Sequence, residues 1–228
     1  MQLSEVGALL DPAPLPIETG YERFPNGVLH VAARTDLHGC SGEMFEWWFR
    51  FRPDTQQYIW WHPVDHQFSD WTETREGTHI GSIHVVVEEF TGLPAEKLSI
   101  QFREPSEFFD AGAYAAARAS GAVSGAVLGR VGLSHTPDRD PSGAIIGSRL
   151  LHIVRDTPWG AALRSHFYLG QDLPAQGLSP AEITAAFSDE FGQALLQHAY
   201  NEFTFLSRFL PSLYIAENRD TNLPEVPW

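Results

Sequence analysis

The longest amphipathic pattern in the chain lies near its C-terminus, over residues 193–211. Apolar residues recur there at steps of three and four, which is the period of one face of an α-helix. His198 and Glu202 share that apolar face and stand one helical turn apart. Because an unpaired buried carboxylate is unfavourable, the pattern predicts either a bound metal ion or a hydrogen-bonded His–Glu pair in the interior.

A histidine-rich motif follows an aromatic stripe in the first third of the chain. The stripe at positions 44, 47, 48 and 51 predicts a short amphipathic helix over residues 42–51. Residues 58–66 then read YIWWHPVDH. Pro63 interrupts regular structure there, and such a bend can direct His62 and His66 into a cavity. The alternative is a His–Asp hydrogen bond that stiffens a loop.

Most of the remaining chain is predicted as β-strands from its alternation and its β-branched residues. We expect strands at residues 28–33, 79–90, 98–104, 115–133, 148–156 and 163–169, and a loop at 67–77. In the second of these strands, alternation places Glu89 with three aliphatic residues and Glu88 on the more polar, solvated face. Glu89 is therefore either a strand-end residue that reaches solvent or a buried carboxylate with a partner, and Glu88 is the neighbouring candidate.

The ends of the chain are predicted from proline positions and capping signals. Residues 1–25 are rich in proline and are expected to form an extended arm. The sequence from Ser179 to Glu182 has the form of a capping box with proline at the first helical position, so a short helix should begin there. Pro211 is expected to end the long helix, and residues 213–228 are expected to form a polar tail.

The order of these elements predicts an α+β fold, in which a curved antiparallel sheet grips a long C-terminal helix. A sheet wrapped around a helix leaves a cavity between the two. No repeat or linker divides the sequence, so residues 1–228 are expected to form a single domain.

Charge and composition narrow the partners and the location. The chain has 228 residues, with 15 Lys and Arg against 29 Asp and Glu, for a formal net charge of −14. Such a chain repels phosphate, so neither nucleic acid nor membrane is expected as a partner. The N-terminus lacks a signal-peptide pattern, and a single cysteine, Cys40, allows no internal disulfide. We therefore expect a cytoplasmic protein.

Candidate metal ligands occur on both sides of the predicted cavity. They are His62 and His66 at the bend, Glu89 on the sheet, and His198 and Glu202 on the helix. Two histidines with two carboxylates suit zinc, and iron or manganese is also compatible. Two other functions remain open. One is a non-catalytic carrier of a hydrophobic or aromatic small molecule, and the other is an iron-dependent oxygenase that uses the same residues.

Four segments of the chain resemble the 2,4-diacetylphloroglucinol hydrolase family. They read EWWF at 46–49, YIWWHPVDH at 58–66, RSHFYLG at 164–170, and HAYNE at 198–202 followed by FLP at 209–211. The resemblance implies a helix-grip fold similar to the Bet v 1 group and a zinc ion held by two His and two Glu. It also implies hydrolysis of a carbon–carbon bond between an acyl group and a phenolic or β-diketone-like molecule.

The resemblance assigns roles by position. The implied metal ligands are His62, Glu89, His198 and Glu202. The implied catalytic residues, similar to the family's cavity His and Tyr, are His152 and Tyr168. The residues expected to contact substrate are Trp61, Asp65 and His66. The expected partner is a small aromatic acyl compound, and a homodimer is compatible with the sequence.

Two positions depart from the family's pattern. Arg52 stands where a histidine is expected, and His166 stands where an arginine is expected. These departures leave the exact substrate open.

Overall fold

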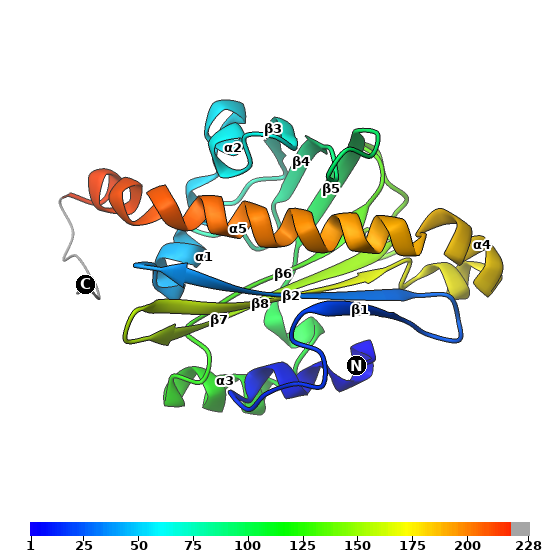
Figure 1. The fold of residues 1–228 in the computed structure, drawn as a ribbon, viewed down its shortest axis with the longest axis horizontal. Helices are drawn as coiled ribbons and strands as arrows, with labels where there is room; N and C mark the ends of the chain where they lie inside the picture. Colours follow the sequence, from blue (N-terminus) through cyan, green and yellow to red (C-terminus); the bar gives the residue numbers. More distant parts are fainter. Residues whose placement is uncertain (220–228) are drawn as a thin grey trace.

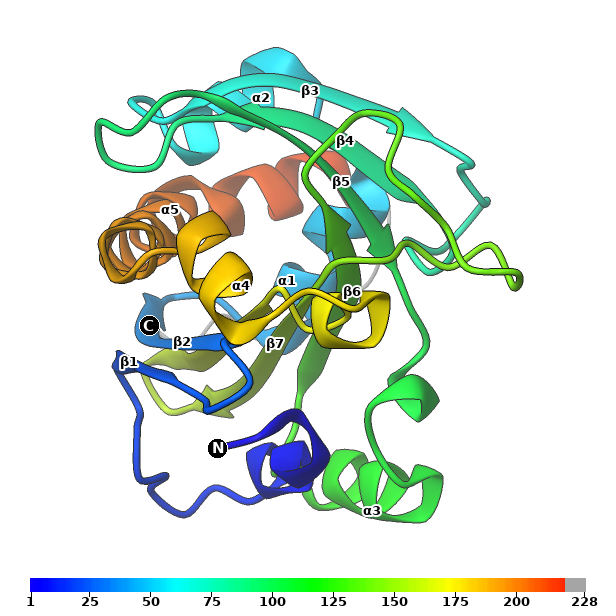
Figure 2. The same ribbon diagram turned by 90° about the vertical axis from the view of Figure 1, so that its right-hand side faces the viewer.

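One antiparallel sheet wraps around helix α5 (Asp189–Glu217) in the computed structural model, which describes residues 1–219 (Figures 1 and 2). Its strands are β1 (Gly20–Arg23), β2 (Leu29–His38), β3 (His66–Thr72), β4 (Ile83–Glu88), β5 (Glu96–Phe102), β6 (Gly125–Gly132), β7 (Ser148–Thr157) and β8 (Gly160–Leu169). Their spatial order is β1-β2-β8-β7-β6-β5-β4-β3. This arrangement confirms the predicted helix-grip fold.

Shorter helices join and cover the sheet. They are η1 (Leu3–Leu10), α1 (Gly42–Phe51), α2 (Thr55–Trp61), η2 (Pro105–Glu107), α3 (Ala111–Ser120), η3 (Leu173–Gln176) and α4 (Pro180–Ala186). Figure 2 shows α5 on the concave side of the sheet, and η1 with α3 on the opposite side. The sheet therefore separates two apolar layers.

The concave layer forms because α5 turns one face toward the strands. Ala199, Phe203, Leu206 and Leu210 on that face are fully buried. They belong to the same apolar cluster as side chains of β2, β6, β7 and β8. His198 and Glu202 lie on this buried face, as predicted.

The convex layer is smaller and covers the other side of the central strands. Val6 and Leu9 of η1 pack with Leu128 of β6, Leu151 of β7 and Tyr168 of β8. Neighbouring residues of one strand point to opposite faces. The paired positions Leu151 and His166 therefore face this layer, whereas the next pair, His152 and Ser165, faces α5.

Local signals account for the helices that border the site. Ser41 caps α1 by accepting from the Met44 amide, and Ser179 caps α4 with Glu182 in a capping box, as predicted. Asp54 caps α2 in the same way, and α2 ends at His62. The bend predicted at Pro63 thus follows a helix end.

Two predicted segments are wrong. Residues 67–77 were expected to be a loop, but His66–Thr72 is edge strand β3, paired with β4. Residues 115–133 were expected to be one strand, but the alanine-rich part belongs to helix α3 (Ala111–Ser120). Asp110 caps that helix through the Ala113 amide, and alanine is the strongest helix former.

The ends of the chain also differ from expectation. The arm is not extended throughout, because η1 is a 3-10 helix and β1 is a strand that pairs with β2. Helix α5 continues through Pro211 to Glu217, so the predicted stop is wrong. A buried proline ring can be kept inside a helix when tertiary packing offsets the lost backbone bond. Residues 220–228 of the predicted tail lie outside the described residues.

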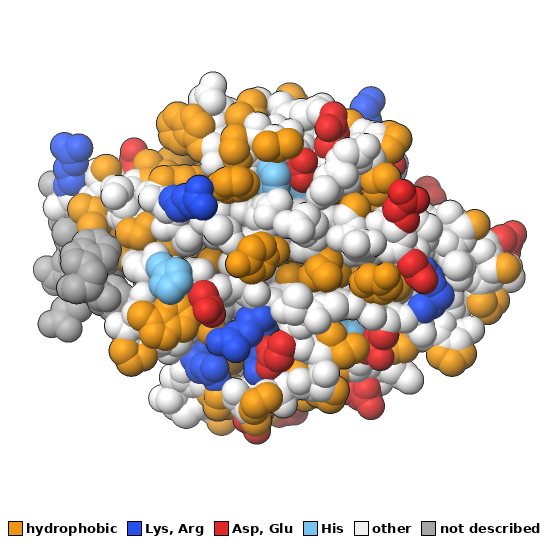
Figure 3. All heavy atoms as spheres, viewed as in Figure 1, with side chains coloured by type: hydrophobic (Ala, Val, Ile, Leu, Met, Phe, Trp, Pro, Cys, Tyr) orange, Lys and Arg blue, Asp and Glu red, His pale blue; other side chains and the backbone are white. Residues whose placement is uncertain are grey.

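Charged side chains of both signs are mixed on the face that carries α5. Figure 3 shows Lys and Arg side chains beside Asp and Glu side chains, with hydrophobic side chains among them. Ion pairs of the chain include Arg164–Glu18 at 2.6 Å and Arg34–Asp36 at 3.5 Å. Among the described residues, none of the helices has the length and apolarity needed to cross a bilayer.

Candidate active site

A cavity lies between the concave face of the sheet and α5. Most of its lining is aromatic or aliphatic and comes from α1, α2, α5 and strands β4 to β8. The side chains that can carry chemistry there are those of Tyr58, His84, Glu88, His152, His198 and Glu202. The cavity is thus an apolar chamber with a few converging polar groups, which is the usual form of a small-molecule site.

Two neighbouring strands place the first pair of polar groups. His66 begins β3 and is the cross-strand partner of Glu88, the last residue of β4. Both side chains are buried, with 3% and 7% of their surface exposed. Nδ1 of His66 donates to the Tyr58 carbonyl oxygen at 2.9 Å. A carbonyl can only accept, so the neutral ring carries its proton on Nδ1, and Nε2 is left without a proton.

Helix α5 places the second pair opposite the first. Nε2 of His66 lies 3.7 Å from Oε2 of Glu202 and has no hydrogen-bond partner in the described part of the chain. Nε2 of His198 lies 3.6 Å from Oε2 of Glu88. Ligand atoms of His66, His198 and Glu202 all lie within 4.8 Å of one another. Two imidazole nitrogens and two carboxylates therefore converge from β3, β4 and α5.

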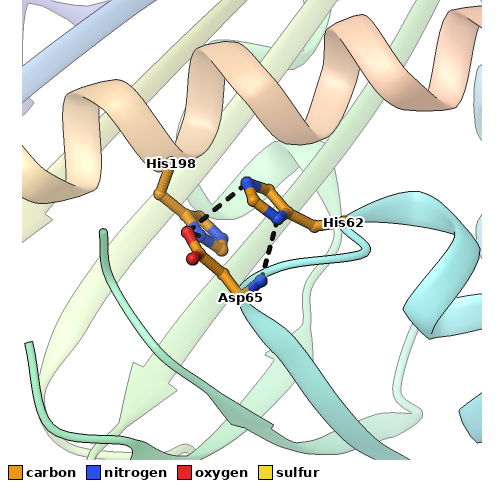
Figure 4. A group of neighbouring side chains, drawn as sticks. All are labelled: His62, Asp65 and His198. Atoms are coloured by element: carbon orange, nitrogen blue, oxygen red, sulfur yellow. Dashed lines mark hydrogen bonds and ion pairs between the residues drawn. The ribbon is translucent and has the colours of Figure 1, made fainter. Parts of the chain in front are cut away.

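Asp65 orients His198 through a hydrogen bond to its Nδ1, on the side of the ring away from Glu88. Figure 4 shows His62 and Asp65, in the turn after α2, converging on His198. Nδ1 of His198 donates to Oδ2 of Asp65 at 2.9 Å, which leaves Nε2 free to face Glu88. The ring of His62 stacks on that of His198, with centroids 4.9 Å apart.

His62 is held differently from His66. Its Nδ1 accepts the Asp65 amide at 3.0 Å, so the proton of the neutral ring must lie on Nε2. That nitrogen lies 3.4 Å from Oδ2 of Asp65. His62, Asp65 and His198 form a second group of side chains close enough to hold an ion. In this group both nitrogens of His62 already face Asp65.

Burial and mutual repulsion shape the ionisation of the carboxyl groups. Burial, together with the nearby Glu88 and Asp65, raises the pKa of Glu202 well above its usual value. Burial also raises the pKa of Glu88, against the lowering effects of His198 and of the hydrogen bond from the Tyr58 hydroxyl. Burial lowers the pKa of His66 well below its usual value. A cation between these groups would relieve the cost of burying both carboxylates.

The opposite wall of the cavity carries a different kind of histidine. His152 on β7 points into the cavity, between the rings of Phe45, Phe167 and Phe203. Its Nδ1 is 2.8 Å from the Ser165 hydroxyl. Burial lowers the pKa of His152 to about 3, so the ring is neutral near pH 7. A serine hydroxyl can donate or accept, so either tautomer of this ring is allowed.

The family model described as the DAPG hydrolase PhiG domain matches residues 1–215. This chain belongs to that family. The family resemblance predicted from the four sequence segments is therefore confirmed.

Relatives of this DAPG hydrolase family member include two named hydrolases. The 2,4-diacetylphloroglucinol hydrolase of a Pseudomonas species is 26% identical over 233 residues, which cover 93% of this chain and 76% of that protein. The phloretin hydrolase of Eubacterium ramulus is 26% identical over 216 residues, which cover 89% and 73%. The crystal structure of Ara h 8.0201 aligns with a TM-score of 0.46 at 12% identity, over 82% of this chain and 99% of that chain.

Several residues predicted from the family resemblance do meet at the cavity. The cavity is lined by Trp61, His152, His198 and Glu202. Asp65 accepts a hydrogen bond from His198, and His66 faces Glu202. The indole nitrogen of Trp61 is buried without a hydrogen-bond partner.

Glu89 does not join the cluster. The prediction that its side chain shares the buried face of the strand is wrong, because Glu88 is buried and Glu89 accepts from Gln67 in an exposed setting. The polar alternate positions of β4 face the cavity, whereas Val85 and Val87 on its outer face are only half-buried. The more polar face of β4 was expected to face solvent, but in the structure that face is turned toward the cavity.

Tyr168 is also separated from the site. It belongs to the convex layer with η1 and stacks on His30, with ring centroids 4.7 Å apart. The prediction that it shares a cavity with His152 is therefore wrong, because the two residues point to opposite faces of adjacent strands. The tyrosine that reaches the cavity is Tyr58, whose hydroxyl donates to Glu88.

Neither Tyr58 nor His84 was among the site residues predicted from the sequence. A signal for His84 was present. The spacing His84, Val86, Glu88 places two ionisable residues on one face of a strand, which is unusual for a solvated face that contains a valine between them.

Proposed function

We propose that this protein hydrolyses the carbon–carbon bond between an acyl carbonyl carbon and a hydroxylated aromatic ring. The observation that carries the proposal is the convergence of His66, Glu88, His198 and Glu202 at one wall of an apolar cavity. Family membership and the two named hydrolases among its relatives support it. Water is the co-substrate: its OH joins the acyl carbon to form a carboxylic acid, and its proton ends on the ring carbon.

The donor set fits a divalent metal ion, with zinc favoured and iron or manganese compatible. We assign the ligand positions to Nε2 of His66, Nε2 of His198, and the carboxylates of Glu88 and Glu202. The separations of 3.6 Å between His198 Nε2 and Glu88 Oε2 and of 3.7 Å between His66 Nε2 and Glu202 Oε2 are near the roughly 3.3 Å expected between tetrahedral zinc ligands. His66 replaces His62 in this assignment because Nε2 of His66 is unprotonated and unpartnered, whereas Nε2 of His62 carries the proton.

A divalent ion held there would supply Lewis acidity toward the acyl carbonyl and toward water. The surrounding side chains orient the ligands. Asp65 fixes the tautomer of His198, and the Tyr58 carbonyl fixes that of His66. Such partners behind the ligand shell commonly set metal affinity. The aromatic walls hold a flat ring and exclude water from it.

The proton balance assigns a role to His152. The leaving ring must gain a proton at carbon when the acyl bond breaks. His152 is neutral and can carry a proton on either nitrogen, since Ser165 accepts or donates as required. It therefore takes a proton from water or from a ring hydroxyl and returns it to the ring carbon.

The test is metal content by plasma mass spectrometry together with hydrolysis of an acylated phenol, on untagged protein. Two matched pairs of variants are compared: Glu88→Gln with Glu89→Gln, and His66→Ala with His62→Ala. We expect about one zinc per chain in the wild type. Glu88→Gln and His66→Ala should lose metal and lose activity at least about 100-fold, and Glu89→Gln should keep both.

Other outcomes would favour a different function or contradict the ligand assignment. Iron in the wild type would favour the oxygenase. A folded wild type that binds aromatic compounds without metal or hydrolysis would favour the carrier. Equal losses in Glu88→Gln and Glu89→Gln would contradict the ligand assignment.

A further inference from the structure

His84 is a buried histidine of the cavity wall that the metal cluster and the proton balance leave unused. It lies on β4, four residues before Glu88 and on the same face, and 1% of its surface is exposed. Its ring is fixed on two sides. Trp71 stacks on it with centroids 4.2 Å apart, and Tyr58 meets it edge-on at 5.1 Å.

The hydrogen bonds of Ser69 decide which nitrogen of His84 carries the proton. The Ser69 hydroxyl lies 3.0 Å from the Pro53 carbonyl oxygen and 2.8 Å from Nε2 of His84. A hydroxyl has one proton and a carbonyl can only accept, so Ser69 donates to Pro53. Ser69 must then accept from Nε2–H of His84. In the neutral ring, Nδ1 is left with a free lone pair and no hydrogen-bond partner among residues 1–219.

This histidine remains neutral under ordinary conditions. Burial lowers the pKa of His84 to about 3. Nδ1 is therefore a hydrogen-bond acceptor and never a donor near pH 7. An acceptor at the wall of an apolar cavity needs a ligand that brings a proton, because an unsatisfied polar group there is unfavourable.

Tyr58 spans the interval between this acceptor and the metal cluster. Its ring contacts His84, and its hydroxyl donates to Glu88. The ring of Tyr58 and its contact with His84 therefore lie between this acceptor and the cluster. A substrate ring whose acyl group lies at the cluster would direct its far edge toward His84.

We propose that Nδ1 of His84 accepts a hydrogen bond from a hydroxyl group of the substrate ring, on the side away from the acyl group. This inference rests on the proposed function and restricts it to acylated aromatics with a free ring hydroxyl there. Analogues in which that hydroxyl is absent or is replaced by fluorine cannot donate and leave Nδ1 unpaired.

The first test measures binding of the ring alone, so that it does not depend on hydrolysis. The probes are 1,3,5-trihydroxybenzene and 1,3,5-trifluorobenzene, which differ little in size but only the first can donate. Affinities for the wild type and for His84→Phe are measured by calorimetry. The phenylalanine keeps the stacking on Trp71 and removes the acceptor. We expect His84→Phe to weaken binding of the hydroxylated ring about 10-fold and to leave the fluorinated ring unchanged.

Two further variants keep the test decisive. His84→Gln retains a side-chain acceptor, so it should bind the hydroxylated ring more tightly than His84→Phe. If His84→Phe does not fold, His84→Gln is compared with the wild type instead. Ser69→Ala frees the tautomer without removing the ring, so its loss should be smaller than that of His84→Phe. Equal losses for both rings, or no loss in His84→Phe, would overturn the proposal, as would a wild type that binds neither ring.

Hydrolysis separates this inference from the proposed function. If the wild type binds the hydroxylated ring through His84 but hydrolyses no acylated phenol, only the proposed function fails. If it hydrolyses acylated phenols with and without the far hydroxyl at equal kcat/KM, only the role of His84 fails.

Discussion

Four buried histidines around the cavity, His66, His84, His152 and His198, use one ring nitrogen to bond to the protein and are proposed to offer the other to a ligand. Nδ1 of His66 donates to a carbonyl and Nδ1 of His198 to a carboxylate, so in the neutral tautomer of each ring Nε2 carries the lone pair. The serine partner of His84 leaves an acceptor, and that of His152 allows either tautomer. In the proposed function the same type of side chain thus serves as metal ligand, hydroxyl acceptor or proton carrier, because its protein partner differs in each case.

A further histidine pair lies on the convex side of the sheet. His30 donates from Nδ1 to Glu22 at 2.9 Å, and its Nε2 accepts from Nδ1 of His166 at 2.9 Å. Nε2 of His166 is buried without a partner. Burial, together with the nearby His30 and Arg164, lowers the pKa of His166 to about 3.

This pair makes folding stability depend on pH. The unfolded chain protonates His166 near pH 6.5, whereas the folded chain does not do so until about pH 3. Stability is therefore full above pH 6.5 and is lost as pH falls toward 3. Between pH 7 and pH 5, the wild type should lose about 2 kcal/mol more of its free energy of unfolding than His166→Gln. Urea titrations at the two pH values measure this difference.

The control for that experiment is His38→Gln, at an exposed position, which should follow the wild type. If His166→Gln and the wild type lose the same stability between the two pH values, burial of a neutral His166 is not the cause of the pH dependence.

At the scale of elements, local signals predicted those segments whose pattern is strong within the segment itself. The apolar period of α5, the capping box of α4 and the aromatic stripe of α1 were sufficient to predict these three helices. Strand β3 was missed because its burial alternates little and its order depends on pairing with β4. The same pairing brings His66 opposite Glu88, so this proposed ligand pair depends on a register that no local pattern encodes.

The face of a strand or helix on which a side chain lies was predicted less well than the strand or helix itself. The helix spacing of His198 and Glu202 was sufficient because both lie on one segment. The choice between Glu88 and Glu89 required knowing which face of the sheet is interior. Where a sheet wraps around a polar site, the usual rule that the apolar face is buried gives the wrong answer.

One contact between elements decides how closely α1 approaches the sheet. Gly42 begins α1 and lies against Gly125 on β6, where an added Cβ at Gly125 would be 2.7 Å from the Gly42 carbonyl oxygen. Gly125→Ala should therefore push α1 away from the sheet and cost about 1–3 kcal/mol of stability. Chemical denaturation measures the loss.

Gly7→Ala is the matched control, because an added Cβ there meets nothing within 4 Å. Its effect should be close to zero or slightly stabilising. An unchanged midpoint for Gly125→Ala would mean that α1 has more freedom than the close contact implies.

At the scale of the whole molecule, the sheet divides the chain into a chemical side and a packing side. The concave side carries the cavity and the converging His and Glu side chains, and the convex side is covered by η1 and α3 (Figure 2). The proposed ligands come from β3, β4 and α5, which are far apart in sequence. An ion bound by them would join the sheet to the helix that it grips, so metal binding should be linked to global stability.

Removal of the metal by chelation should therefore lower the thermal midpoint of the wild type. At a free metal concentration of about 1,000 times Kd, the bound ion contributes about 4 kcal/mol to the free energy of unfolding. Differential scanning calorimetry with and without EDTA, followed by readdition of zinc, measures the loss and its recovery. A midpoint that does not respond to chelation, in protein shown to have lost its metal, would contradict this linkage.

Glu202→Gln provides the variant that separates metal loss from charge repulsion. Burial and the neighbouring Glu88 and Asp65 raise the pKa of Glu202, so without metal this carboxyl group is a source of instability. The amide has nearly the same shape and no charge to bury. Metal-free Glu202→Gln should therefore unfold at a higher temperature than metal-free wild type, and at a lower temperature than wild type with zinc. The variant should also respond little to EDTA. The reverse order of the two metal-free proteins would mean that Glu202 is stabilised by protein partners alone, and the case for an ion at this position would fail.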